Sequence, residues 1–102
     1  MCMDLSCELI GSKATYYVDG RLAIDTAPEL DDAIRELPEK ITDIEVDLTK
    51  TTYLSSAGLR VLVNAHKLVS TRGGVLVVSH PADEVRDILD MTGIGEYISI
   101  VD

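Results

Sequence analysis

The sequence predicts a small α/β domain with a mixed β-sheet, and two features of its patterning support that prediction. Residues 5–10 and 14–19 have the character of strands, and only Gly11-Ser12-Lys13 separates them, so they must form an antiparallel hairpin. Beyond the hairpin, helical and strand periodicities alternate, which is typical of βαβ units with parallel strands. The predicted order is β-β-α-β-α-β-α-β within a single domain that spans residues 1–102.

The first helix is expected directly after the hairpin. Thr26 and Glu29 have the spacing of a capping box, and Pro28 falls in the first turn, where proline is well tolerated. An apolar stripe at i, i+3, i+4 and i+7 follows, formed by Leu30, Ala33, Ile34 and Leu37. Pro38 then ends the helix.

The remainder of the chain contains three further strands and two helices. Alternating or continuous apolar residues predict strands at 44–48, 75–78 and 97–101. One helix begins at Ser55-Ser56 and ends at Gly73-Gly74, glycines that suit a left-handed cap. The last helix begins at Pro81 and ends at Gly93. These elements complete the sheet through parallel crossovers.

Composition narrows the class of protein. The 102 residues include 18 acidic and 9 basic side chains, which give a formal net charge of −9. Nucleic-acid binding needs clustered Lys and Arg, so this charge argues against it. The amino terminus lacks the basic and apolar regions of a signal peptide, and no apolar run approaches the length of a membrane span. We therefore expect a cytoplasmic protein that does not insert into a membrane.

Residues suited to metal binding or covalent chemistry are few. The cysteines and histidines are Cys2, Cys7, His66 and His80. No pair among them has the spacing of zinc ligands. The sequence also lacks a phosphate-binding glycine motif and the nucleophile elbow of hydrolases. We therefore expect no enzymatic activity, no metal and no cofactor.

The most informative stretch runs from residue 47 to residue 59, with the sequence DLTKTTYLSSAGL. Strand periodicity ends at its start and helical periodicity begins at its end, so Ser55 and Ser56 open a helix. The first turn of a helix has unpaired N–H groups and a positive dipole end, which stabilise an anion or a phosphate carried by a serine. A compatible alternative is that Ser56 is an ordinary N-cap.

This stretch resembles the signature loop of STAS domains, the fold of bacterial anti-sigma-factor antagonists. In that family a strand ends in Asp-Leu-Ser, and an aromatic residue, an aliphatic residue and Asp-Ser-Ser/Thr-Gly-Leu follow a few residues later. Residues 47–49 (DLT) match the first part, and residues 53–59 (YLSSAGL) match the second. The similarity continues at residues 20–22 (GRL), 26–30 (TAPEL) and 89–94 (LDMTGI), so it extends over nearly the whole chain.

Two positions depart from the family pattern. The residue that usually accepts a phosphoryl group directly precedes the glycine, and here Ala57 precedes Gly58. Ser55 replaces the aspartate before the serine pair, while Ser56 matches the first hydroxyl of that pair. Either Ser56 (or Ser55) has become the accepting residue, or this chain is not switched by phosphorylation.

The resemblance implies a partner-switching regulator. The unmodified protein would bind a serine kinase that acts as an anti-sigma factor, and phosphorylation of Ser56 would oppose that binding. Ser55, Ala57 and Gly58 would shape the contact surface, and Asp47 would order the loop. The family's kinases consume ATP, whereas this chain would need no cofactor.

The helix that follows Ser56 has a broad apolar arc. Besides its central stripe, three residues widen the arc on one side, namely Val61, Ala65 and Leu68. Such an arc is either buried between the sheet and a neighbouring helix or partly exposed for a partner. The family resemblance makes this flank a candidate partner-binding surface.

A second class of function stays open. Ala57 at the usual accepting position is compatible with a STAS subunit that is never phosphorylated and docks as an accessory on the ATPase of a membrane transport complex. The phosphorylation state of the protein distinguishes the two classes, as does the identity of the neighbouring genes.

Overall fold

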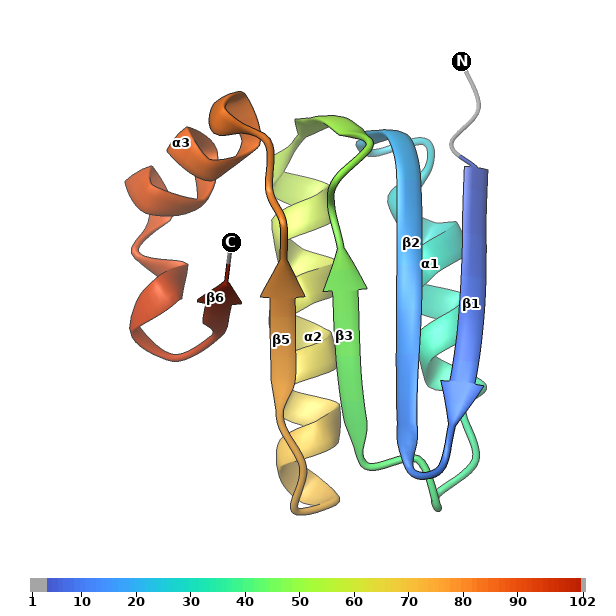
Figure 1. The fold of residues 1–102 in the computed structure, drawn as a ribbon. Coiled ribbons are helices and arrows are strands. Elements are labelled where there is room, and N and C mark those ends of the chain that lie inside the picture. Colours follow the sequence, from blue (N-terminus) through green and yellow to red (C-terminus); the bar gives the residue numbers. More distant parts are fainter. Residues whose placement is uncertain (1–3, 102) are drawn as a thin grey trace.

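The computed structural model describes residues 4–101, which form one mixed β-sheet and its helices (Figure 1). The strand order is β1-β2-β3-β5-β6, and a further short strand, β4, pairs with β2. β1 and β2 are antiparallel, whereas the β2–β3, β3–β5, β5–β6 and β2–β4 pairs are parallel. The prediction of an α/β domain with an amino-terminal hairpin followed by parallel crossovers is confirmed.

The hairpin consists of β1 (Asp4–Ile10) and β2 (Lys13–Leu22). Its register pairs Leu5 with Val18 and Ile10 with Lys13. The tight turn between the strands places Gly11 at φ 60°, a conformation that glycine adopts without strain. The helix-facing side chains of β2 are buried in alternation, as the strand period requires.

The remaining elements follow in nearly the predicted order. The helices are α1 (Ala27–Arg35), α2 (Ser56–Thr71) and α3 (Asp83–Thr92), and a 3-10 turn, η1, lies at Ile94–Glu96. The strands are β3 (Asp43–Asp47), β4 (Thr51–Leu54), β5 (Leu76–Ser79) and β6 (Ser99–Val101). Gly73 and Gly93 adopt the left-handed conformation at the ends of α2 and α3, as predicted.

The helices leave one face of the sheet uncovered. α1 and α2 lie side by side against one face, while the opposite face of β1, β2, β3 and β5 carries no helix (Figure 1). The core between these layers includes the fully buried side chains of Leu22, Leu30, Ile44, Leu62 and Val78. Burial of each such side chain contributes about 1.5–3 kcal/mol. None of the helices in residues 4–101 combines the length and apolar character needed to cross a membrane.

Strand β4 was not predicted. It extends the pairing along β2 beyond the end of β3. The strand has only four residues, TTYL, and their burial does not alternate, so the sequence shows no strand periodicity here. Thr51 is 2% exposed, and its hydroxyl donates to Val18 O at 2.8 Å, so a buried polar side chain is satisfied within the sheet. The predicted final strand also starts later, at Ser99, because Tyr97 and Ile98 still donate backbone hydrogen bonds to Ile94 O.

The predicted capping box at the start of α1 is wrong. Thr26 is the N-cap residue, but its hydroxyl makes no cap bond. Thr26 Oγ1 instead donates to Arg21 O at 2.6 Å and accepts from the Ala23 N–H at 2.9 Å. These bonds stabilise the turn that leads from β2 into α1, so the hydroxyl is not available to the helix.

Candidate partner-binding site

Asp47, the last residue of β3, holds the turn into β4. Its Oδ1 accepts hydrogen bonds from the backbone N–H of Thr49 at 2.9 Å and from the Thr49 hydroxyl at 2.6 Å. An aspartate side chain that accepts a hydrogen bond from the backbone N–H two residues later forms an Asx turn. The Thr51 N–H completes the turn by donating to Leu48 O at 3.1 Å. Asp47 therefore constrains the path of the chain toward the serine pair.

Ser55, and not Ser56, caps α2. Ser55 has an extended backbone, with φ −92° and ψ 175°, and its Oγ accepts a hydrogen bond from the Gly58 N–H at 3.4 Å. Its own N–H donates to Leu22 O at 3.0 Å, which ties the cap to the end of β2. The alternative that made Ser56 the N-cap is wrong, because Ser56 is already the first residue inside the helix.

Gly58 allows the first turn of α2 to lie directly on the sheet. A Cβ at this position would be 2.7 Å from Leu22 O and 2.8 Å from Leu54 Cδ1, closer than such atoms approach in proteins. The residue is buried, so it shapes the site from beneath and offers a partner no side chain. The glycine in the signature thus has a packing requirement.

Ser56 is the exposed hydroxyl of the site. Its side chain accepts and donates no hydrogen bond within residues 4–101, in contrast to that of Ser55. The first turn of α2 contains no acidic residue, so no local carboxylate offsets the positive end of the helix dipole. An anion attached to Ser56 would therefore meet unpaired backbone N–H groups and a favourable potential.

The predicted apolar flank of α2 is mostly part of the core. Val61 is 5% exposed and Ala65 is 1% exposed, so their side chains cannot form a partner surface. They are buried because α1 packs against this side of α2. Leu68 differs, since it is only partly buried and borders a shallow groove between the two helices. Of the three residues, Leu68 alone stays a candidate for partner contact.

A second groove between α1 and α2 lies next to the serine pair and was not predicted. It has a volume of about 290 Å³, and Ala57, Arg60 and Ile24 are among its lining residues. Ile24, in the turn before α1, is 80% exposed. A single exposed apolar side chain is ordinary on a protein surface, so the interest of Ile24 lies in its position beside this groove. The signal for it in the sequence is weak, because Ile24 follows the apolar residues Leu22 and Ala23 and does not stand out from them.

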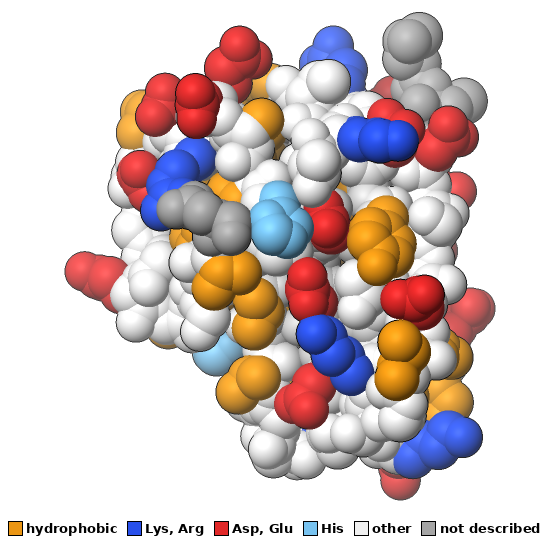
Figure 2. All heavy atoms as spheres, in the orientation of Figure 1, with side chains coloured by type: hydrophobic (Ala, Val, Ile, Leu, Met, Phe, Trp, Pro, Cys, Tyr) orange, Lys and Arg blue, Asp and Glu red, His pale blue; other side chains and the backbone are white. Residues whose placement is uncertain are grey.

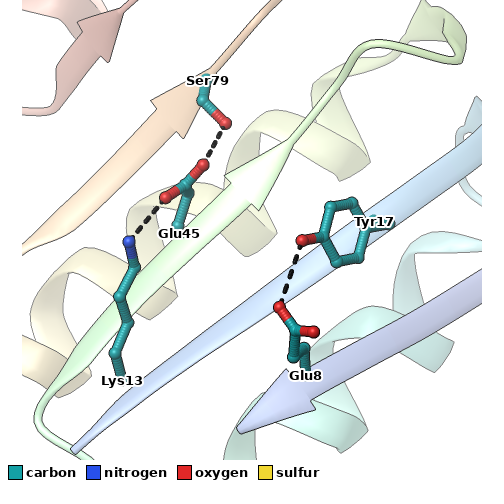
Figure 3. A network of polar contacts seen from close by, with 5 residues as sticks. All are labelled: Glu8, Lys13, Tyr17, Glu45 and Ser79. Carbon is teal, nitrogen blue, oxygen red and sulfur yellow. Dashed lines mark hydrogen bonds and ion pairs between the residues drawn. The ribbon is translucent and has the colours of Figure 1, made fainter. Parts of the chain in front are cut away.

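The uncovered face of the sheet carries a separate polar network (Figure 3). Lys13 Nζ lies 2.7 Å from Glu45 Oε1, and the Ser79 hydroxyl donates to Glu45 Oε2 at 2.7 Å. The bonds from Lys13 and Ser79 lower the pKa of Glu45, and the bond to Glu45 raises the pKa of Lys13. Within residues 4–101, no titratable side chain is hydrogen-bonded to the Ser56 hydroxyl.

The family model of the STAS domain matches residues 6–102 of the sequence. This chain belongs to the STAS domain family. An anti-sigma-B factor antagonist from Listeria monocytogenes is 31% identical to this STAS domain over 104 residues, which cover 96% of this chain and 90% of the relative. The resemblance found in the signature loop therefore extends over both proteins.

Solved structures share the STAS fold. A Thermotoga maritima protein assigned as an anti-sigma factor antagonist superposes with a TM-score of 0.88 at 20% identity, covering 96% of this chain and 86% of that chain. The phosphorylated form of SpoIIAA, a Bacillus cell fate determinant, gives a TM-score of 0.77 at 13% identity, covering 97% and 92% of the two chains. At these identities the similarity establishes the common fold.

Proposed function

We propose that this STAS domain is an anti-sigma factor antagonist that binds an anti-sigma serine kinase in the cytoplasm and is released by phosphorylation of Ser56. The observation that supports the proposal most strongly is the exposed, unbonded hydroxyl of Ser56 in the first turn of α2, inside the family signature. The activity named for the Listeria relative supports the antagonist role. The phosphorylated SpoIIAA structure gives a precedent for modification on this fold.

The proposed contact surface centres on the start of α2. Ser56 and the half-buried Ser55 and Ala57 provide a small, smooth patch, and Ile24 and Arg60 border it across the adjacent groove. Leu68 extends the surface along the shallow groove that it borders between α1 and α2. Small residues beside Ser56 leave room for the catalytic cleft of a kinase, and the exposed Ile24 supplies an apolar anchor for the docked partner.

Phosphorylation would change the surface by charge and hydration. A phosphoserine carries about 1.5–2 negative charges at neutral pH and three acceptor oxygens. The unpaired N–H groups of α2 would stabilise this phosphate in the free domain, but docking would require its removal from water. The modified domain would therefore be stable yet a poor ligand for the same partner.

Phosphosite mapping tests the proposal. The purified chain is incubated with its cognate kinase and ATP, and the modified residue is located by mass spectrometry in the native protein and in Ser55→Ala and Ser56→Ala. Modification should occur in the native protein and in Ser55→Ala and disappear in Ser56→Ala. Modification that persists in Ser56→Ala but disappears in Ser55→Ala would show that Ser55 is the phosphorylated residue and would contradict the assignment to Ser56.

A second function is favoured by one specific observation, the alanine at the usual accepting position. If neither serine is modified by any kinase that binds the domain, the chain fits better as a non-phosphorylated accessory of a membrane transport ATPase. In both cases we infer that the domain acts by binding and has no turnover of its own. Hydrolysis of a nucleotide or ester that survives stringent purification and is lost in Ser56→Ala would contradict that inference.

A further inference from the structure

Three metal-ligating side chains meet on the face of the sheet that no helix covers. Glu45 and Asp47 are two residues apart on β3, so they point to the same side of the sheet. His80 directly follows β5, the neighbour of β3. Each of the three offers a donor atom, and these atoms all lie within 4.8 Å of one another. Figure 2 shows a histidine beside acidic side chains on this face.

The backbone brings His80 to this side of the sheet. The hydroxyl of Ser79 bonds Glu45, so Ser79 already points to the uncovered face (Figure 3). Regular strand alternation would send the next side chain to the opposite face. His80 instead has φ 53°, and among residues 4–101 it is the only non-glycine residue with a positive φ. Its N–H donates to Val101 O at 2.8 Å, which fixes this conformation against β6.

Neighbouring side chains orient both carboxylates. Lys13 and Ser79 bond the two oxygens of Glu45, and Thr49 bonds Oδ1 of Asp47 twice. Asp47 Oδ2 accepts no hydrogen bond within residues 4–101, and Glu45 Oε2 has a further lone pair beyond its bond to Ser79. Outer hydrogen bonds of this kind hold the ligands of metal sites in position.

We propose that Glu45, Asp47 and His80 form a binding site for one divalent transition-metal ion of the zinc class. Ligand atoms about 2.0–2.2 Å from a tetrahedral zinc ion lie about 3.4 Å from one another, so small side-chain rotations bring these donors to an ion. An imidazole with two carboxylates suits Zn²⁺, whereas Ca²⁺ and Mg²⁺ prefer sites made of oxygen. The two carboxylates supply two negative charges to the ion, and Lys13, which pairs with Glu45, leaves one net positive charge at the occupied site.

Such an ion would do two things in this fold. It would link β3 to the segment after β5, two parts of the chain that otherwise meet through the strand ladder and side-chain bonds such as that of Ser79 to Glu45. It would also act on the β3–β4 turn, because Asp47 holds Thr49 through its other oxygen. Three protein ligands leave a fourth position for water or for a donor from a bound partner.

Calorimetric titration with Zn²⁺ tests the proposal. The full chain is freed of metal with EDTA and carries Cys2→Ser and Cys7→Ser, so that thiols cannot bind the ion. We expect one site per chain, a rise in melting temperature with Zn²⁺, and no competition by Mg²⁺. His80→Asn should weaken binding by about tenfold or more, since it removes a ligand. Asparagine tolerates a positive φ, so this variant should keep the fold.

His66→Asn is the matched control. His66 lies on α2, where its ring packs against Tyr97 at 5.4 Å, so its replacement should leave zinc affinity unchanged. Glu45→Gln, which keeps the size of the side chain, should weaken binding as His80→Asn does. In the unmutated site, zinc should shift the ring resonances of His80 and not those of His66. Absence of zinc binding, or affinity that is equal in the native site, His80→Asn and Glu45→Gln, would overturn the proposal.

Discussion

Ser55, Ser56 and Gly58 lie within four positions of the sequence but have different tasks in the structure. Ser55 caps α2, Ser56 presents a free hydroxyl, and Gly58 lets the helix approach Leu22. The family pattern located all three residues. It could not show which serine caps the helix, because Ser55 and Ser56 are the same residue type and have the same capping preference. Only the backbone conformation decides which of them precedes the helix.

The difference between the two serines predicts a difference in stability. Ser55→Ala removes the cap acceptor and should lower the free energy of unfolding by about 0.5–1 kcal/mol, at the lower end for caps because the bond is long. Ser56→Ala should change it by less than about 0.5 kcal/mol. Urea unfolding of both variants measures this, and equal losses would contradict the assignment of the cap.

At the scale of elements, α2 is held at both ends by contacts that join distant parts of the sequence. Its carboxyl end is fixed by Arg72, whose guanidinium donates to Leu37 O, Pro38 O and Ile41 O over 2.9–3.2 Å. The carboxyl ends of α2 and α3 were predictable from glycines, and β1, β2, β3 and β5 were predictable from strand periodicity. The role of Arg72 and the existence of β4 were not, because both depend on segments about 30 residues away in the sequence.

The Arg72 contacts predict a stability difference between two arginines. Arg72→Lys keeps the charge but loses the planar fork that reaches three carbonyls, and it should cost about 1–2 kcal/mol. Arg35→Lys is the control, because Arg35 makes an exposed i,i+4 pair with Asp31 that contributes less than about 0.5 kcal/mol. Thermal and urea unfolding compare the two, and similar losses would refute the anchoring role of Arg72.

The close approach of Gly74 to the β3 side of the sheet gives a second test of element packing. A Cβ at Gly74 would overlap the Thr42 carbonyl oxygen, so Gly74→Ala should displace the chain before β5 and cost about 3 kcal/mol or more. Gly95→Ala would meet only Ile100 Cδ1 at 3.5 Å, an ordinary contact, and should cost less than about 1 kcal/mol. The melting temperature of Gly74→Ala should therefore lie below that of Gly95→Ala, and the reverse order would contradict this account of the packing.

The burial of the α2 flank also makes a prediction. Val61→Asp places an unpaired charge in the core and should abolish the cooperative unfolding transition. Leu68→Asp, at a partly buried position, should leave a folded domain that binds its partner less well. Circular dichroism on heating compares the stability of the two variants, and a binding assay of the folded variant follows. If Val61→Asp were as stable as Leu68→Asp, this account would be contradicted.

At the scale of the whole molecule, the fold separates two surfaces. The start of α2 and its grooves lie on the helical side, while the Glu45, Asp47 and His80 cluster lies on the uncovered face of the sheet. The α/β class and the signature loop could be predicted from one sequence because they depend on local periodicity and motif spacing. The cluster could not, because it depends on the pairing of β3 with β5 and on the unusual backbone of His80.

The net charge of −9 affects the rate at which the domain associates with a charged partner. An acidic domain associates faster with a basic surface at low ionic strength, and salt slows that association by screening. If the proposed kinase partner presents a basic surface, its association rate with this domain should fall as salt is added, while the dissociation rate changes little. Stopped-flow or surface-binding kinetics at several salt concentrations measure both rates; a salt-independent association rate would count against charge steering.

The central claim is that the state of Ser56 controls partner binding, and one measurement tests it most directly. The domain is prepared with phosphoserine placed chemically at position 56, which avoids dependence on the kinase, and its affinity for the cognate anti-sigma kinase is compared with that of the unmodified chain by calorimetry. We predict that phosphorylation weakens binding by about 100-fold or more, which corresponds to about 2.7 kcal/mol. Equal affinity of the two forms would contradict the account.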